Sequence, residues 1–195
     1  FPILFYNMNI HDMNNLNDLD ISLLGFLVEK PLHGYELHRE VTDLKGFGIV
    51  WKLKIGKLYA MLNKLHSANL VTTTSYREGN RPIRNEYCIT ANGEKTFREW
   101  LKKPVRHGRD FRNSFLLKLF FSLKQSKLDA LNLITAQQQE CVKWQRHFSE
   151  KLINQKNAKE CSTNFEEFVH RYRWTQVEAF LKWLDWISEK IREAE

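Results

Sequence analysis

Side chains that bind nucleic acids gather in one stretch of this 195-residue chain. Between Trp51 and Thr90 the sequence has seven Lys or Arg residues and only two acidic residues, Glu78 and Glu86. Lysine and arginine bind phosphates, and amide or hydroxyl groups beside them can reach phosphates and base edges. The whole chain has a net charge of +7, which suits a polyanionic partner, and the clustering of this charge is more informative than its sum. The stretch therefore indicates a nucleic-acid-binding surface.

The basic stretch contains an apolar repeat that predicts a helix over residues 55–68. Four apolar residues recur at the spacing i, i+3, i+4 and i+7: Leu58, Met61, Leu62 and Leu65. The opposite side and its flanks carry small, polar or basic residues: Gly56, Lys57, Tyr59, Ala60, Asn63 and Lys64. Such a helix can enter a DNA major groove, with Lys57 and Asn63 at base edges. An ordinary core helix with a solvated polar face is the alternative.

The elements around this helix predict a winged helix. We expect helices over 21–28 and 35–41 before it, the first capped within Asp18 to Asp20 and the second ending near Gly46 and Gly48. Two β-prone runs follow over 70–76 and 84–89, joined by a basic turn over 77–83, and Thr90 then caps a helix through Leu101. The predicted order is therefore three helices, two strands and one further helix. This is the order of a winged helix, in which a helix-turn-helix is followed by a β-hairpin wing.

The second half of the chain is predicted to be helical throughout and to form a dimer. Two capping-box patterns, over 126–129 and 163–166, each start a helix. The last helix carries a broad apolar stripe of Trp174, Val177, Phe180, Leu181, Trp183, Leu184, Ile187 and Ile191. This stripe is wider than the surface that one neighbouring helix can bury. We therefore expect a second subunit to cover the rest of it, in an antiparallel two-fold homodimer. A three-helix bundle within one chain is the alternative.

These patterns divide the chain into an Asn-rich arm or added residues over 1–17, a winged-helix domain over 18–103 and a helical domain over 109–195.

The three cysteines, Cys88, Cys141 and Cys161, lack metal-binding spacing and are interpreted as reduced thiols that fill core space. We expect no metal, no cofactor, no membrane span and a cytoplasmic location. The sequence also lacks a Gly-rich phosphate loop, an HExxH motif and a nucleophile elbow, so an enzyme is not expected.

The winged-helix half resembles the PadR family of bacterial transcriptional regulators. The matching segments are 24–27 (Leu-Gly-Phe-Leu), 31–36 (Pro-Leu-His-Gly-Tyr-Glu), 81–82 (Arg-Pro) and 87–93 (Tyr-Cys-Ile-Thr-Ala-Asn-Gly), with Trp51, Leu58, Tyr59, Leu62, Leu65, Leu70, Val71, Trp100 and Leu101. The tail segments 109–112 (Arg-Asp-Phe-Arg) and 116–119 (Leu-Leu-Lys-Leu) are similar to the family's dimerization region. The length of the tail and its Trp-rich last helix resemble the long-tailed, virulence-activator branch.

This resemblance implies a homodimer that binds an inverted repeat in double-stranded DNA and usually represses transcription. By position, it implies that Tyr35, Lys54, Lys57, Tyr59 and Lys64 contact phosphates or base edges, and that Asn80, Arg81 and Arg84 of the wing lie at the minor groove. Residues 55–57 (Ile-Gly-Lys) depart from the family, because a small hydroxyl residue often opens its recognition helix. A protein-interaction module, or a co-regulator that acts through a partner, is the other hypothesis.

The aromatic residues of the second half suggest a possible signal input. Some members of the family sense phenolic or planar compounds, so a small aromatic effector could bind between subunits beside the rings of Trp144, Phe148, Trp174, Phe180, Trp183 and Trp186. The alternative is that these rings form the core of the dimer.

Overall fold

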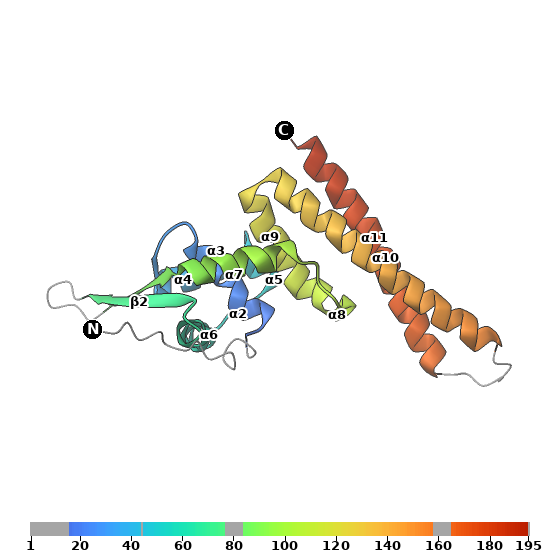
Figure 1. Cartoon of the computed structure of the whole chain (residues 1–195), viewed down its shortest axis with the longest axis horizontal. Helices are drawn as coiled ribbons and strands as arrows, with labels where there is room; N and C mark the ends of the chain where they lie inside the picture. Colours follow the sequence, from blue (N-terminus) through green and yellow to red (C-terminus); the bar gives the residue numbers. More distant parts are fainter. Residues whose placement is uncertain (1–15, 44, 77–83, 158–164, 195) are drawn as a thin grey trace, which may run out of the picture. The chain divides into compact units, whose positions relative to one another are not determined.

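The computed structural model describes residues 16–43, 45–76, 84–157 and 165–194, and the chain splits into two compact units, 1–101 and 102–195. Figure 1 follows the chain from the N-terminal unit, in blue to green, to the helices of the C-terminal unit, in green to red. The predicted fold class, mainly helical with a small β-wing, is confirmed. Among the described helices, none is long and apolar enough to cross a membrane.

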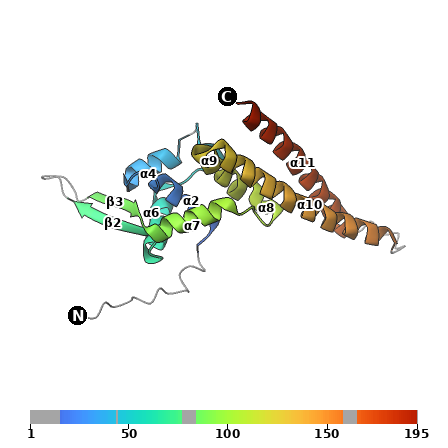
Figure 2. The same cartoon turned by 45° about the horizontal axis from the view of Figure 1, so that its top comes forward.

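The N-terminal unit consists of short helices around a small antiparallel sheet. Its elements are α2 (Asp18–Ser22), α3 (Leu24–Leu27), β1 (Leu32–His33), α4 (Gly34–Val41), α5 (Phe47–Val50), α6 (Ile55–Ser67), β2 (Val71–Tyr76), β3 (Arg84–Ile89) and α7 (Ala91–Lys102). The strand order is β1-β3-β2, with Val71 opposite Ile89 and Leu32 opposite Tyr87. Figure 2 shows β2 and β3 side by side. The sheet thus places the wing directly after α6.

The first part of this unit differs from the sequence prediction in three places. The expected helix over 21–28 is divided at Leu23 into α2 and α3. Its cap is Asn17 and not a residue within Asp18 to Asp20: the Asn17 side-chain oxygen accepts from the Asp20 amide at 2.9 Å, and the Asp20 carboxylate accepts from the Asn17 amide at 3.1 Å. Helix α5 forms in the region where glycines predicted an irregular segment, and the two-residue strand β1 was not predicted at all.

The end of α6 is fixed by a Schellman motif. The Leu70 amide donates to the Leu65 carbonyl and the Asn69 amide donates to the His66 carbonyl, both at 2.9 Å. Asn69 adopts a φ of 55°, a left-handed conformation that asparagine tolerates better than most residues. The side chains of Leu65 and Leu70 are both fully buried, which is the apolar contact that accompanies this motif. The motif turns the chain sharply from α6 into β2.

Helix α7 begins against the backbone of this same turn. Thr90 caps the helix as predicted, since its hydroxyl accepts from the Gly93 amide at 2.9 Å. The Thr90 amide donates to the Leu70 carbonyl at 3.0 Å, and the Thr90 hydroxyl donates to the Asn69 carbonyl at 2.9 Å. A Cβ atom on Gly93 would lie 2.1 Å from the Leu70 carbonyl oxygen. The close approach of α7 to Leu70 therefore requires glycine at position 93.

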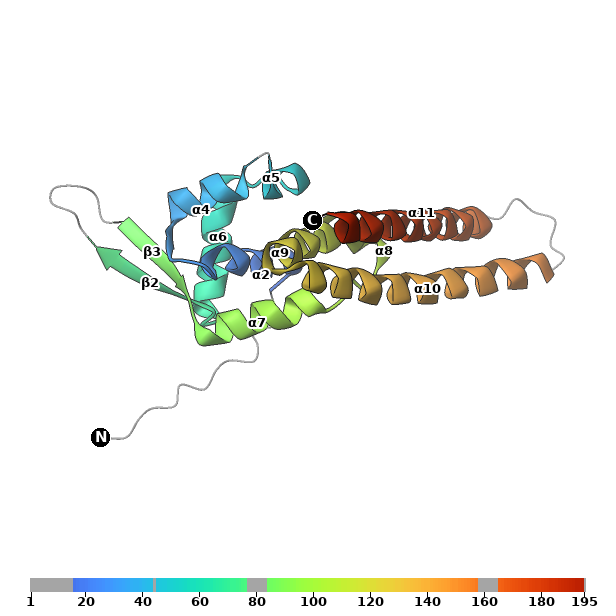
Figure 3. The same cartoon turned by 90° about the horizontal axis from the view of Figure 1, so that it is seen from above.

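The C-terminal unit is helical, as predicted. Its elements are α8 (Gly108–Asp110), the π-helix η1 (Phe111–Phe115), α9 (Leu116–Gln125), α10 (Lys127–Asn157) and α11 (Phe165–Glu193). Figure 3 shows α10 and α11 as a long antiparallel pair. Ser126 caps α10 as expected, because its hydroxyl accepts from the Asp129 amide at 3.0 Å. The capping pattern predicted over 163–166 begins outside the described residues.

Part of the stripe assigned to a dimer is covered within the chain. Val177, Leu184 and Ile191 are buried in a core that also includes Phe111 and Phe115. Phe180, Leu181, Trp183 and Ile187 are partly buried against this core. The expectation that the stripe cannot be satisfied in one chain is therefore wrong for Val177, Leu184 and Ile191, because α10, η1 and α9 cover them. The large apolar side chains that stay exposed on α11 are Phe165, Phe168, Tyr172 and Trp186.

A buried glutamine connects α10 to the segment before α8. The side-chain oxygen of Gln137 accepts from the Val105 amide at 2.8 Å, and its nitrogen donates to the Val105 carbonyl at 3.3 Å. The same nitrogen lies 3.8 Å from the sulfur of Cys141. Burial raises the pKa of Cys141 to about 11, so this thiol stays protonated and fills core space as predicted. Cys88 is half-buried and free, and Cys161 lies outside the described residues.

Replacing Gln137 by leucine is expected to destabilise the C-terminal unit by about 2–3 kcal/mol, because the substitution leaves the buried Val105 amide and carbonyl without partners. Urea unfolding followed by circular dichroism measures this change. Gln139→Leu is the control, since Gln139 is exposed on the same helix. Equal unfolding midpoints for the two variants would contradict the role assigned to Gln137.

Candidate nucleic-acid interface

Helix α6 separates a buried apolar face from an exposed face, as its sequence predicts. Leu58, Met61, Leu62 and Leu65 are at most 1% exposed. The exposed side chains of the helix include those of Ile55, Lys57, Tyr59, Ala60 and Asn63. A Cβ atom added to Gly56 would have nothing within 4 Å, so the first turn is open to a large partner. The side chains at the centre of the outward face are therefore small, so the helix can closely approach the backbone of a binding partner.

Two of the predicted cations lie at the start of this face. Lys54 is the N-cap residue of α6 and Lys57 lies in its first turn, and both are exposed. The first turn contains no acidic residue, so nothing in it neutralises the positive end of the helix dipole. A cation at this position gains nothing from the dipole, whereas a phosphate would gain from both the dipole and the lysines. The start of α6 thus attracts anions.

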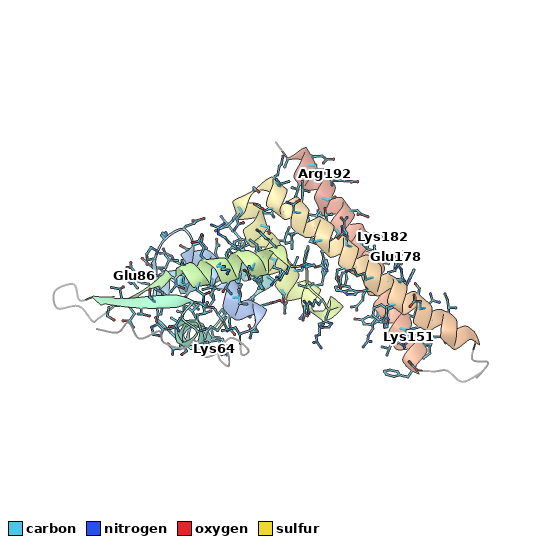
Figure 4. All side chains as sticks on the ribbon, in the orientation of Figure 1. Lys64, Glu86, Lys151, Glu178, Lys182 and Arg192 are labelled. Atoms are coloured by element: carbon cyan, nitrogen blue, oxygen red, sulfur yellow. The ribbon has the colours of Figure 1, made fainter. Side chains whose placement is uncertain are left out.

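Lys64, which was expected at phosphates or base edges, has a partner within the chain. Its ammonium group lies 3.4 Å from a carboxylate oxygen of Asp20, a residue that is 1% exposed. Figure 4 labels Lys64 on α6. The other Asp20 oxygen has no hydrogen-bond partner among the described residues, so this buried carboxylate depends on Lys64 for its charge balance. The structure therefore gives Lys64 a structural contact between α2 and α6.

The ring of Tyr59 lies at the start of α4, next to the residue that precedes Tyr35. A Cβ atom on Gly34 would lie 2.6 Å from the ring of Tyr59, which shows that this ring lies directly against the Gly34 backbone. Tyr59 is 40% exposed and the neighbouring Tyr35 is 68% exposed, so both remain accessible from solvent. The pKa of Tyr87 on β3 is raised, mainly by burial and also by the nearby Tyr59, which places Tyr59 close to the wing. Tyr59 thus packs within the fold and is also exposed on its surface.

His33 and Glu36 shape the start of α4. The His33 amide donates to a carboxylate oxygen of Glu36 at 3.1 Å. One ring nitrogen of His33 lies 3.3 Å from the carbonyl oxygen of Asn85 on β3. These contacts tie α4 to the sheet.

The tip of the wing lies outside the described residues, and with it the predicted contacts Asn80 and Arg81. The backbone of Arg84 is described and pairs with Tyr76 at the end of the hairpin, whereas its side chain is not. Near that end the Ser75 hydroxyl donates to the Asn85 side-chain oxygen at 2.8 Å. The described part of the hairpin therefore ends at the pair of Tyr76 and Arg84.

Ile55 is a surface residue that the sequence prediction did not include. Its spacing from Leu58, Leu62 and Leu65 continues the apolar stripe, so the pattern alone indicates a core residue. In the structure Ile55 is the first residue of α6 and is 43% exposed. An apolar side chain on such a face can contact the methyl group of thymine. The open space beside Gly56 is the neighbouring feature that distinguishes this end of the helix.

Comparison with known families identifies this unit. Residues 23–99 match the model of the Transcriptional regulator PadR-like family. Residues 23–99 therefore form a PadR-like domain. The matched range contains α4, α6, β2 and β3, so it covers the whole described part of the candidate interface. The resemblance predicted from the sequence is thus confirmed over this range, and the matching model describes a family of transcriptional regulators. The assignment to the long-tailed branch stays a prediction.

Similar proteins include PadR of Bacillus subtilis. The Negative transcriptional regulator PadR of Bacillus subtilis (strain 168) is 25% identical over 121 residues, which span 62% of this chain and 65% of that protein. A crystal structure of Bacillus subtilis PadR in complex with operator DNA is 20% identical, with a TM-score of 0.44 over 90% of this chain and 98% of that one. A structure of the same protein in complex with p-coumaric acid is 22% identical, with a TM-score of 0.39 over 90% and 96%.

Proposed function

We propose that this PadR-like chain is a sequence-specific regulator that binds an inverted-repeat operator as a homodimer. Helix α6 would enter the major groove, and the basic wing would lie at the minor groove. The exposed face of α6 carries the proposal, because it is small at Gly56 and Ala60 and basic at Lys54 and Lys57. The complex of Bacillus subtilis PadR with operator DNA supports it by analogy. A cytoplasmic location goes with this proposal, because the operator lies there.

Within this interface the contacts have different roles. Lys54 and Lys57 would bind phosphates, which supplies affinity and register. Asn63, Tyr35 and the exposed part of Tyr59 would reach base edges or sugars, and Ile55 would contact thymine methyl groups. Asn80, Arg81 and Arg84 would follow the minor groove, where an arginine senses groove width. Lys64 is the weakest of the predicted contacts, because Asp20 already binds its ammonium group.

The dimer is proposed from the C-terminal unit. Helix α11 keeps four large apolar side chains exposed, three of them in its N-terminal turns: Phe165, Phe168, Tyr172 and Trp186. A two-fold axis would bring these side chains onto the same surface of a second copy. Trp174, Phe180, Leu181, Trp183 and Ile187 are only partly buried and could complete this contact.

Fluorescence anisotropy tests the DNA proposal directly. The labelled DNA would be the intergenic duplex upstream of the protein's own gene, with a scrambled duplex of equal composition as the control, at several salt concentrations. We expect tight, salt-sensitive binding to the first duplex and weaker binding to the second. Absence of binding to both would favour the alternative, a winged-helix module or co-regulator that acts through a protein partner.

Replacing Arg81 by alanine is expected to weaken binding to every duplex and to lower the slope of log K against log[salt] by about one unit, because one phosphate-type contact is lost. The same anisotropy titrations measure both quantities. Arg98→Ala is the control: Arg98 is an exposed cation on α7 that already binds Glu94 at 2.6 Å. An unchanged slope for Arg81→Ala would remove Arg81 from the interface.

We also propose that a small aromatic effector modulates this regulator. Four of the six rings expected around an effector, Trp144, Phe148, Phe180 and Trp183, line one cavity of the C-terminal unit. The Trp174 indole instead donates to the Ser149 hydroxyl at 3.1 Å, and Trp186 is exposed. The complex of Bacillus subtilis PadR with p-coumaric acid supports an aromatic effector by analogy.

A further inference from the structure

The cavity of the C-terminal unit has a volume of about 930 Å³ and lies among residues 106–116, α10 and α11. Its wall contains stacked aromatic rings: the centroids of Phe111 and Phe180 are 4.1 Å apart with planes 9° from parallel. The ring of Trp183 meets Phe111 edge-on at 5.9 Å. Trp144 and Phe148 of α10 line the cavity as well. Flat faces of this kind bind planar rings.

The same cavity is unusually rich in cations. Arg106, Arg109, Arg112 and Arg173 line it together with His107, whereas no Asp or Glu is among the lining residues. Within the described part of the chain, Arg109 is the one arginine of this set with an ion pair, to the adjacent Asp110 at 3.7 Å. The guanidinium of Arg173 lies 6.0 Å from the ring centroid of Phe148, which holds the cation beside an aromatic wall. Three guanidinium groups therefore have no carboxylate partner there.

The charge and size of the cavity indicate which aromatic compound would fit. A neutral planar ring would use the aromatic wall but leave Arg106, Arg112 and Arg173 without an anion. A single carboxylate would engage one or two of these groups through a bidentate contact. A phosphate monoester carries nearly two charges and three acceptor oxygens, which suits several arginines at once. The volume is also at the upper end of the range for small-molecule sites, roughly 300–1,000 Å³, so a ligand larger than one ring fits.

We propose that this cavity binds a planar aromatic compound that carries a phosphate group, the chemistry shared by nucleoside phosphates and aryl phosphates. The stacked rings would hold the planar part, and Arg106, Arg112 and Arg173 would hold the phosphate. This inference rests on the proposed aromatic effector and specifies that the effector carries a negatively charged group. It does not depend on DNA binding.

Isothermal titration calorimetry of the full-length protein without DNA measures the affinity for each probe and so tests the ligand class. The probes are guanosine 5′-monophosphate, adenosine 5′-monophosphate, 1-naphthyl phosphate, 2-naphthoate, 2-naphthol and inorganic phosphate. We expect an aromatic phosphate to bind at least about tenfold tighter than 2-naphthoate, 2-naphthol or inorganic phosphate, because it combines contact with the aromatic wall and a group that can bind several arginines at once. Tight binding of the two nucleotides would identify nucleoside phosphates as the source, and tight binding of 1-naphthyl phosphate alone would identify aryl phosphates.

Paired arginine variants locate the site. Arg112→Gln and Arg173→Gln are each expected to weaken binding of the aromatic phosphate at least about tenfold and to leave 2-naphthol unchanged. Arg171→Gln is the matched control, because Arg171 is exposed on the same helix, two residues from Arg173, and does not line the cavity. Thermal melts of all three variants check that the unit stays folded.

Each remaining outcome overturns a defined part of the proposal. Equal binding of 2-naphthoate, 2-naphthol and the phosphates would overturn the phosphate class and leave the aromatic effector standing. Failure of every aromatic probe to bind would overturn both proposals. An equal loss of affinity in Arg171→Gln and Arg173→Gln would mean that general charge attraction, and not this cavity, holds the phosphate.

Discussion

Replacing Gly93 by alanine is expected to cost the N-terminal unit at least about 3 kcal/mol of its free energy of unfolding. The added methyl group would lie 2.1 Å from the Leu70 carbonyl oxygen, a backbone atom that no side-chain rotation can move away. Separating α7 from Leu70 would also lengthen the hydrogen bond from the Thr90 amide to that oxygen. Because small domains are stable by roughly 5–15 kcal/mol, much of the stability of this unit would be lost.

Chemical unfolding would measure this loss, with hydrogen exchange of the α6 and α7 amides to follow the N-terminal unit alone. Gly56→Ala is the matched control, because a Cβ atom at Gly56 meets no atom within 4 Å. Gly56 is a helical residue of α6, so alanine there is expected to raise stability by about 0.5–1 kcal/mol. If Gly93→Ala and Gly56→Ala unfold at the same denaturant concentration, the close contact at Leu70 is not required by the fold.

Introducing a carboxylate at the same open position, by Gly56→Glu, is expected to weaken operator binding at least about 100-fold and to preserve the fold. The exposed first turn of α6 has room for the longer side chain, and an acid there gains from the helix dipole. In the proposed complex, however, that carboxylate would face DNA phosphates, and juxtaposed like charges cost several kcal/mol.

Anisotropy titrations at 0.1 M salt and thermal melts of the free protein would give the two quantities for Gly56→Glu. Gln139→Glu makes the same change in charge on exposed α10 of the other unit and should bind the operator like the unaltered protein. Full affinity in Gly56→Glu would mean that the start of α6 does not lie in the groove.

Helix α6 shows which features the periodicity of the sequence can predict and which it cannot. Its four buried apolar residues and its exposed Lys54, Lys57 and Asn63 follow from the helical repeat and the types of its residues. The partner of Lys64 could not be predicted in this way, because Asp20 is 44 residues away in the sequence. Ile55 was missed for the opposite reason: the repeat continues through it, but the first turn of the helix projects beyond the core.

Elements that depend on tertiary contacts were harder to predict. Helix α5 has four residues and β1 has two, so each contains only about one period of its pattern, too little for a repeat to be recognised. Strand β1 exists because Leu32 pairs with Tyr87, and α5 includes Gly48, where a Cβ atom would lie 2.7 Å from the carbonyl oxygens of Thr42 and Asp43. The apolar stripe of α11 was identified correctly, but periodicity cannot say whether α10 of the same chain or another subunit covers it.

Because η1 is a π-helix, the effect of a deletion in the C-terminal unit depends on where the residue is removed. A π-turn holds one more residue than an α-turn, so the five residues of η1 rotate the preceding side chains relative to α9. Phe111 and Arg112 face the cavity from within this segment. Loss of one residue from η1 could close the π-turn into an α-turn and leave the side chains before it nearly in place, whereas loss of one residue from α9 would turn Phe111 and Arg112 by about 100° relative to the helices that follow. Relatives that differ by one residue within α9 would therefore present different groups to the cavity.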